Sequence, residues 1–141
     1  MTQRDETGSA LIEFTMLTLV VIVPLLYVLV AVFQVQRASF GVTAASLAAT
    51  RAFVQSPDLA TAERRWRHAA DVTLADHGIA DAQVTRRCEP QCFVSGSSVE
   101  VVITVEQPLP MMPTVFGDSL SSIIVESRHT EPFGRYRANA N

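Results

Sequence analysis

The sequence is poor in the residue types on which most enzymes and nucleic-acid-binding proteins depend. It has 141 residues, no lysine and a net charge of −3, so it lacks the basic surface with which nucleic-acid binders attract phosphates. Its three histidines, His68, His77 and His129, are scattered and match no zinc-binding spacing. No glycine-rich phosphate loop is present. We therefore expect no catalytic residues, no metal or cofactor, and no nucleic-acid or small-molecule ligand.

One short motif nevertheless needs testing as an enzyme signature. Gly117-Asp118-Ser119-Leu120 spells the nucleophile block of the GDSL esterases. In those enzymes the block stands near the N-terminus of a much larger domain, and an Asp-x-x-His pair supplies the base. Here the block lies near the end of the chain, and the residue three before His129 is Glu126. Because a nucleophilic serine needs a base and an orienting group, we interpret the motif as a turn before a strand.

What the sequence does contain is one long apolar run near its N-terminus. From Phe14 to Phe33 only Thr15, Thr18 and Pro24 interrupt it. Twenty helical residues span about 30 Å, the thickness of a bilayer's hydrocarbon core. A proline inside such a helix is tolerated better in a membrane than in water. The pattern predicts a transmembrane segment that continues, rich in alanine, as one amphipathic helix to about residue 54.

A cleaved secretory signal peptide is the alternative interpretation of this run. Such a peptide has a positive start, an apolar core of about 7–15 residues and a small-residue cleavage site directly after it. In the leader, Arg4 is outweighed by Asp5 and Glu6, and the small residues 44–46 lie well beyond the run. We therefore expect the helix to be retained.

An acidic residue, Glu13, stands at the edge of the run. A carboxylate at the bilayer centre costs about 2.5–3.5 kcal/mol on insertion scales, so such a residue usually has a partner or a role. At the edge the cost is smaller, and near the start of a helix the dipole favours a negative charge. Physical chemistry alone therefore also allows Glu13 to be a boundary residue in the headgroup region.

The residues around Glu13 add a resemblance. Gly8-Ser9-Ala10-Leu11-Ile12-Glu13-Phe14 before an apolar helix resembles the class III signal of type IV pilins and pseudopilins. With Val23-Pro24-Leu25-Leu26 it is most similar to the TadE-like minor pilins or pseudopilins of tight-adherence (Tad/Flp) pilus systems. The resemblance implies that residues 1–8 are a leader, which a membrane-embedded prepilin peptidase cuts off between Gly8 and Ser9. It also implies that Glu13 pairs with the N-terminal amine of a neighbouring pilin subunit.

The same resemblance implies a location and an orientation. The N-terminus would lie in the cytoplasm and residues 55–141 outside it, with the helix of residues 9–54 in the cytoplasmic (inner) membrane or, after assembly, in a pilus. The charges do not support this orientation independently, because Arg4 precedes the run whereas Arg37 and Arg51 follow it. The alternative function is a single-pass anchored extracytoplasmic adaptor or sensor with no role in a pilus.

Beyond the long helix, residues 55–141 predict a small α+β head. Ser56-Pro57-Asp58 is typical of a helix start, with Ser56 as the capping residue, and Gly78 is typical of a helix end. The apolar face between them begins at Leu59 and includes Ala62, Trp66 and positions near 70 and 74. Arg64-Arg65-Trp66-Arg67 could form a basic-aromatic patch, but its arginines fall largely off this face, so we interpret them as a solvated side.

Three strands are predicted after this helix, at residues 83–88, 99–106 and 120–130, and a polar, frayed tail at residues 133–141. The fold class is therefore α+β. A long N-terminal membrane-spanning helix would continue into an extracytoplasmic head, in which helices pack on one side of an antiparallel sheet of three or so strands.

Two cysteines lie close together in this head. Cys88 and Cys92 are four residues apart and flank Pro90, which favours a turn. In an exported domain such a pair is typical of a local disulfide, and in a cytosolic one of free thiols. The spacing is not that of a C-x-x-C redox motif, and no histidine lies near in sequence to complete a zinc site. We predict a structural disulfide between Cys88 and Cys92.

Overall fold

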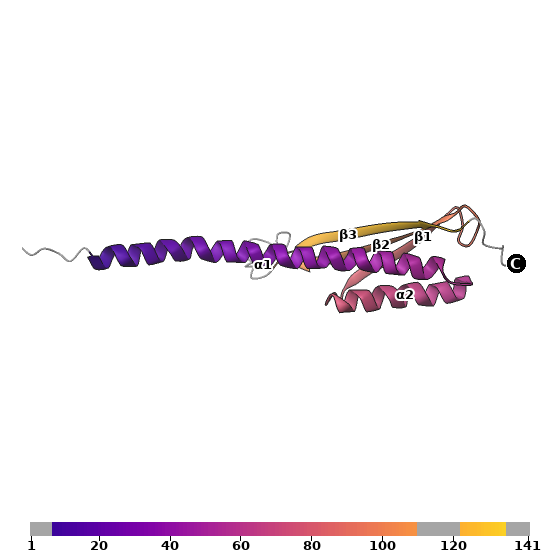
Figure 1. Cartoon of the computed structure of the whole chain (residues 1–141), viewed down its shortest axis with the longest axis horizontal. Coiled ribbons are helices and arrows are strands. Elements are labelled where there is room, and N and C mark those ends of the chain that lie inside the picture. The colour runs from indigo at the N-terminus through magenta and orange to yellow at the C-terminus, as the bar shows by residue number, and fades with distance from the viewer. Residues whose placement is uncertain (1–6, 110–121, 135–141) are drawn as a thin grey trace, which may run out of the picture.

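The protein is organised along a single helix. The structure, a computed structural model, describes residues 7–109 and 122–134. The helix α1, Thr7–Val54, has 48 residues, and its N-terminal half projects away from the rest of the molecule (Figure 1). Helix α2, Leu59–Asp76, folds back along the C-terminal half of α1. Both predicted helices are therefore present, and the long one is continuous through Pro24.

Three strands complete the head. These are β1 (Ala82–Glu89), β2 (Ser98–Pro108) and β3 (Ser122–Pro132), and they form one antiparallel sheet in the order β1-β2-β3. The sheet lies against α1, with β3 running beside it in the same direction (Figure 1). The predicted α+β fold class is confirmed. The strands extend beyond their apolar patterns, and the predicted start of the third strand at Leu120 lies outside the described residues.

The core is built on the small side chains of α1. Buried residues spaced three and four apart place one narrow stripe of this helix against the head. Three of them are alanines, whose small size lets the neighbouring elements approach closely. On the sheet side, every second residue of β2 points into the core. The fully or almost fully buried members are Ala38, Val42, Ala45, Ala49 and Phe53 on α1, Ala62, Trp66, Ala70 and Leu74 on α2, and Val99, Val101, Ile103 and Val105 on β2. Leu59, predicted on the apolar face of α2, is instead 49% exposed.

The predicted cap of α2 is wrong by two residues. Asp58, not Ser56, is the N-cap residue, and its carboxylate accepts a hydrogen bond from the Thr61 backbone amide at 2.8 Å. The hydrogen bonds from the Thr61 backbone and hydroxyl hold the pKa of Asp58 below its ordinary value. Ser56 is buried and donates its hydroxyl hydrogen bond to the Ala52 carbonyl at 2.7 Å. It therefore closes the end of α1 instead of opening α2.

The other end of α2 closes as predicted at Gly78. This glycine has a φ of +68°, a backbone angle that residues with a side chain rarely adopt. Its amide donates a hydrogen bond to the Ala75 carbonyl at 2.8 Å. The Ile79 amide bonds to the Leu74 carbonyl at 2.9 Å, which completes a Schellman end. The Ile79 side chain, 8% exposed, is thereby turned into the core.

This turn packs directly on Gly41 in the middle of α1. A Cβ atom at Gly41 would lie 2.7 Å from Ile79 Cδ1 and 2.9 Å from His77 Cβ. A glycine in a helix interior costs about 1 kcal/mol relative to alanine. The cost is offset here because the missing side chain lets α1 and the end of α2 approach closely.

We predict that Gly41→Val destabilises the head by about 1–3 kcal/mol, because the added atoms overpack this contact. Urea unfolding of the detergent-solubilised protein, followed by the fluorescence of its single tryptophan, Trp66, measures the change. Ser39→Val is the matched control, since Ser39 is exposed on the same helix and should tolerate the same side chain. Equal unfolding midpoints for the two variants would contradict the packing role of Gly41.

Candidate functional site

The most conspicuous surface of the protein is the N-terminal half of α1. Large apolar side chains cover it on all sides, and the head buries none of the most apolar window. Leu11 is 72% exposed, Phe14 71% and Phe33 63%. Because such a surface is stable only in an apolar environment, this helix anchors the head. It is long and apolar enough to cross a membrane, and it is the one such helix among the described residues.

Glu13 is the one acidic residue of this surface among the described positions of α1. Its side chain is exposed, and it has no hydrogen bond or ion pair within the described part of the chain. The helix begins at Thr7, so Glu13 lies beyond the first turn, where the dipole effect is concentrated. The dipole therefore gives Glu13 less stabilisation than its place near the helix start predicted. Its carboxylate therefore has no partner among the residues that the structure describes.

Gly8 and Ser9 belong to the first turns of α1 in this structure. The bond between them, the predicted cleavage point, thus lies five residues before Glu13 on the same helix. Residues 1–6, most of the predicted leader, lie outside the described residues. The three predicted residues Gly8, Ser9 and Glu13 are brought together at one end of α1 by local sequence alone.

The predicted cysteine pair lies at the opposite end of the molecule, in and after the end of β1. Cys88 and Cys92 form a disulfide, with their Cα atoms 5.2 Å apart. The bridge closes the loop between β1 and β2, which projects at the end of the head farthest from the anchor (Figure 1). It is therefore separate from the N-terminal residues.

Arg86 joins this disulfide to both helices, and the sequence analysis missed it. Its guanidinium lies 3.0 Å from Cys92 Sγ and 4.8 Å from the centre of the Phe53 ring. It also pairs with Glu63 of α2, which in turn accepts a hydrogen bond from the Trp66 indole at 2.8 Å. The alternation of β1 could have indicated this role. Alternate residues of a strand point to the same side, so Arg86 points to the core side together with Val84 and Cys88.

Three phenylalanines pack beside Arg86. The ring centres of Phe53 and Phe93 are 5.5 Å apart, and those of Phe93 and Phe133 are 5.2 Å apart. Such tilted arrangements are favourable for aromatic rings. Phe133 is only 2% exposed, and its amide bonds to the Ser97 carbonyl at 2.8 Å. The predicted frayed tail is therefore wrong at its first residue, whereas residues 135–141 lie outside the described part.

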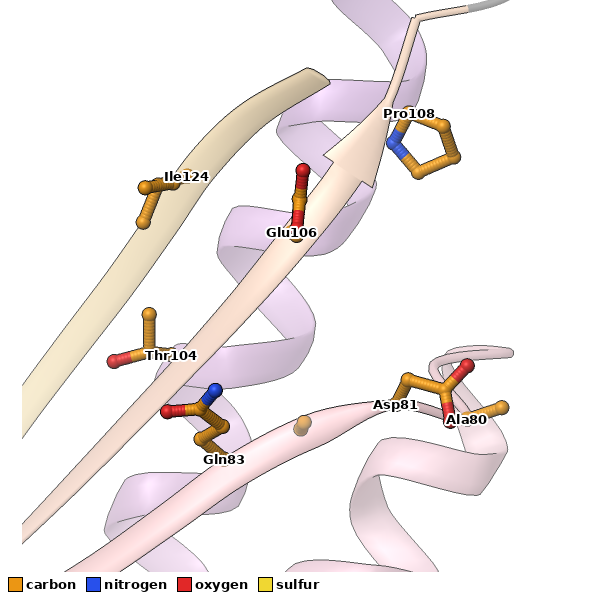
Figure 2. A pocket seen from close by; sticks show the side chains of 8 residues that line it. Ala80, Asp81, Gln83, Thr104, Glu106, Pro108 and Ile124 are labelled. Carbon is orange, nitrogen blue, oxygen red and sulfur yellow. The ribbon is translucent and has the colours of Figure 1, made fainter. Parts of the chain in front are cut away.

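A hollow lies at the end of the sheet nearest the anchor. Asp81, Glu106 and Ile124 line it from three adjacent chain segments, with Gln83 and Thr104 beside them (Figure 2). Its described lining contains no histidine, cysteine or serine, and Glu106 accepts a hydrogen bond from the Ser122 hydroxyl beside it. The two carboxylates, of Asp81 and Glu106, are exposed to solvent.

The other residues that the sequence offered for catalysis or binding do not form a common site among the described residues. In the described ranges, no three His, Cys, Asp or Glu residues gather closely enough to hold a metal ion. Gly117-Asp118-Ser119-Leu120 lies outside the described residues. On α2, Arg64, Arg65 and Arg67 are exposed, while Trp66 is 2% exposed. The three arginines are therefore solvated as predicted, and the Arg67 guanidinium lies 5.1 Å from the centre of the Trp66 ring.

Comparison of the chain with protein-family models, with curated proteins and with solved structures gave no match. The architecture itself is like that of pilins, because a long apolar N-terminal helix precedes a small α+β domain. The geometry thus establishes an anchored head, and the specific role of the N-terminal motif is a matter of proposal.

We predict that Arg86→Met lowers the free energy of unfolding by about 1–3 kcal/mol, because it leaves the half-buried Glu63 without its charged partner. Arg87→Met is the control, since its side chain points outward from the same strand and should change stability by about 0.5 kcal/mol or less. Urea unfolding reported by Trp66 fluorescence compares them. Indistinguishable curves would show that the Arg86 contacts contribute nothing.

Proposed function

We propose that this protein is a TadE-like pseudopilin or minor pilin, which takes part in assembly of, or secretion by, a Tad/Flp pilus system. A prepilin peptidase removes residues 1–8 by cutting after Gly8. The mature helix stays in the cytoplasmic membrane until it assembles with other pilin subunits, and the head lies on the extracytoplasmic side. The protein itself is not an enzyme in this proposal.

The observation that carries the proposal is the carboxylate of Glu13, which has no partner in the described part of the chain and lies on an uncovered apolar helix. A charge in an apolar environment is stabilised only when a partner of opposite sign is close. Cleavage after Gly8 creates such a partner, because the new α-amino group of Ser9 is positively charged. Within one helix the two groups are four residues apart. In a neighbouring subunit that is shifted along the helix axis, the amine can lie beside Glu13.

The disulfide supports the proposed orientation. Disulfides persist in oxidising compartments such as the periplasm and are rare in the bacterial cytosol. The Cys88–Cys92 bridge belongs to the head, so it supports a head outside the cytoplasm and an N-terminus inside it. Prepilin peptidases cut on the cytoplasmic side, so this orientation presents Gly8 to the right compartment.

A plain single-pass adaptor or sensor is the alternative function, and the uncovered anchor and compact head would serve it equally. The two proposals differ in the fate of the first eight residues and in the importance of Glu13. An adaptor would keep its leader and would tolerate a neutral residue at position 13. Both differences can be measured.

We predict that co-expression with a prepilin peptidase of a Tad system removes Met1 to Gly8, which an intact-mass measurement of the purified protein detects. Gly8→Ala should abolish the loss, because the peptidase recognises the glycine before the cut. Ser9→Ala, which keeps a small residue after the cut, should be processed normally. An unchanged mass for the unsubstituted protein would refute processing.

We predict that Glu13→Gln blocks co-assembly with other pilin subunits while leaving membrane insertion and head folding intact. The substitution keeps the shape of the side chain and removes only the charge that the amine would need. Recovery of the protein in the sheared pilus fraction measures assembly, and Trp66 fluorescence checks the head. Asp71→Asn, an exposed neutralisation on α2, is the control. Normal assembly of the Glu13 variant would exclude the charge pair.

A further inference from the structure

Two large apolar side chains are unusually exposed beyond the end of the apolar run. Phe40 on α1 is 70% exposed, and Ile124 on β3 is 72% exposed. Farther from the anchor, the most exposed large apolar residues in the described ranges are Leu59, Val72 and Val94, at 41–49%. Phe40 and Ile124 are therefore clearly more exposed than the other large apolar residues on the surface of the head.

Phe40 and Ile124 lie at the same height, by which we mean the same distance along the α1 axis from the apolar run. Ser127 of β3 contacts Ser46 of α1, with their hydroxyl oxygens 3.1 Å apart. Ile124 lies three strand residues nearer the anchor, about 10 Å, which equals about seven residues of helix. Because β3 runs beside α1 in the same direction (Figure 1), this places Ile124 level with residues 39–40 of α1.

A second route through the structure gives the same height. Gly41 of α1 packs on Ile79 at the end of α2. Two residues later, Asp81 directly precedes β1. In the neighbouring strands, Glu106 of β2 pairs with Ile124 of β3 and forms one row of the sheet with it. Figure 2 shows these three side chains around the same hollow. The row is thus about level with Phe40.

Phe40 and Ile124 nevertheless face different sides of the molecule. At 100° per residue, Phe40 points away from Ala38 and Val42, which are buried against the head. Ile124 lies on the outer face of the sheet, since the neighbouring Val125 packs against the core. A protein partner docking on one side would cover only one of them. A lipid surface surrounds the molecule at a single height and contacts both.

The height agrees with the edge of a bilayer. Phe40 lies seven residues, or about 10 Å, beyond Phe33, and the headgroup layer adds about 5–8 Å to the hydrocarbon core on each side. Helical side chains tilt toward the N-terminus, which brings the Phe40 ring lower. Arg37 lies one turn nearer the anchor along α1, and its guanidinium reaches Gly78 at the end of α2.

We infer that the head rests on the membrane surface, with Phe40 and Ile124 contacting the headgroup layer from two sides of the molecule. Glu106 pairs with Ile124, and Asp81 lines the same hollow. Because these two carboxylates would repel anionic lipids, the contact rests on Phe40 and Ile124 and does not need such lipids. The inference rests on the membrane insertion that the proposed function includes, but not on cleavage or on a role in a pilus. It fixes the height of the head relative to the bilayer.

Nitroxide quenching of single tryptophans tests this contact in the full-length protein. In a Trp66→Phe background, Phe40→Trp and Ile124→Trp are reconstituted in phosphatidylcholine vesicles that carry headgroup-labelled lipid. Val94→Trp, in the loop farthest from the anchor, is the matched control. We expect quenching of the first two to exceed that of the control by about twofold or more, since tryptophan at the interface lies among the headgroups. Adding anionic lipid should not increase it.

Quenching of Phe40→Trp and Ile124→Trp no greater than that of Val94→Trp would overturn the inference. Leu26→Trp, in the apolar run, reports the anchor separately and should be quenched by lipid labelled in the acyl chain. If it is not, the membrane anchor itself fails, and the surface contact fails with it. Should Trp66→Phe disturb the fold, the same comparison is made with Trp66 retained, after subtraction of the quenching of the unsubstituted protein.

Discussion

The structure depends on one constraint: a segment apolar enough to cross a bilayer can do so only if its backbone satisfies its hydrogen bonds within that segment. A single strand cannot do this, so the apolar run is helical. The helix does not stop where the run ends but continues to Val54, and every other element packs along its second half. The same helix is therefore anchor, spine of the core and, in the proposed function, the assembling surface.

The head packs on α1 at both ends of the head. At the end nearer the anchor, Gly41 admits the closing turn of α2, and the missing side chain permits the close contact. At the far end, Arg86 connects the disulfide, Glu63 and Phe53, so β1, α2 and α1 meet at one guanidinium. Because the two attachments act together, a displacement of α1 along its axis would carry the head with it. An assembling subunit and a signalling anchor would both use such rigid coupling.

Several errors of the sequence-based predictions have a common cause. Ser56 and Asp58 are both good capping residues, and only the path of the chain between the helices decides which one caps α2. Phe133 is the first residue of a polar tail, yet its ring packs against Phe53 and Phe93 in the core. Arg86 is charged, as surface residues usually are, but in the alternation of β1 it falls on the side that faces the core. For Phe133 and Arg86, contacts between residues far apart in sequence decided the outcome.

By itself, the sequence determined the anchor, the places of Gly8, Ser9 and Glu13 before it, and the α+β class of the head. These follow from local properties, namely a continuous apolar run, helix ends and the alternation of β-branched residues. Only the tertiary structure decided that Arg86 holds the far end together and that Phe40 and Ile124 lie at one height. Those relations join elements separated by many residues, and no local pattern encodes the distance between them.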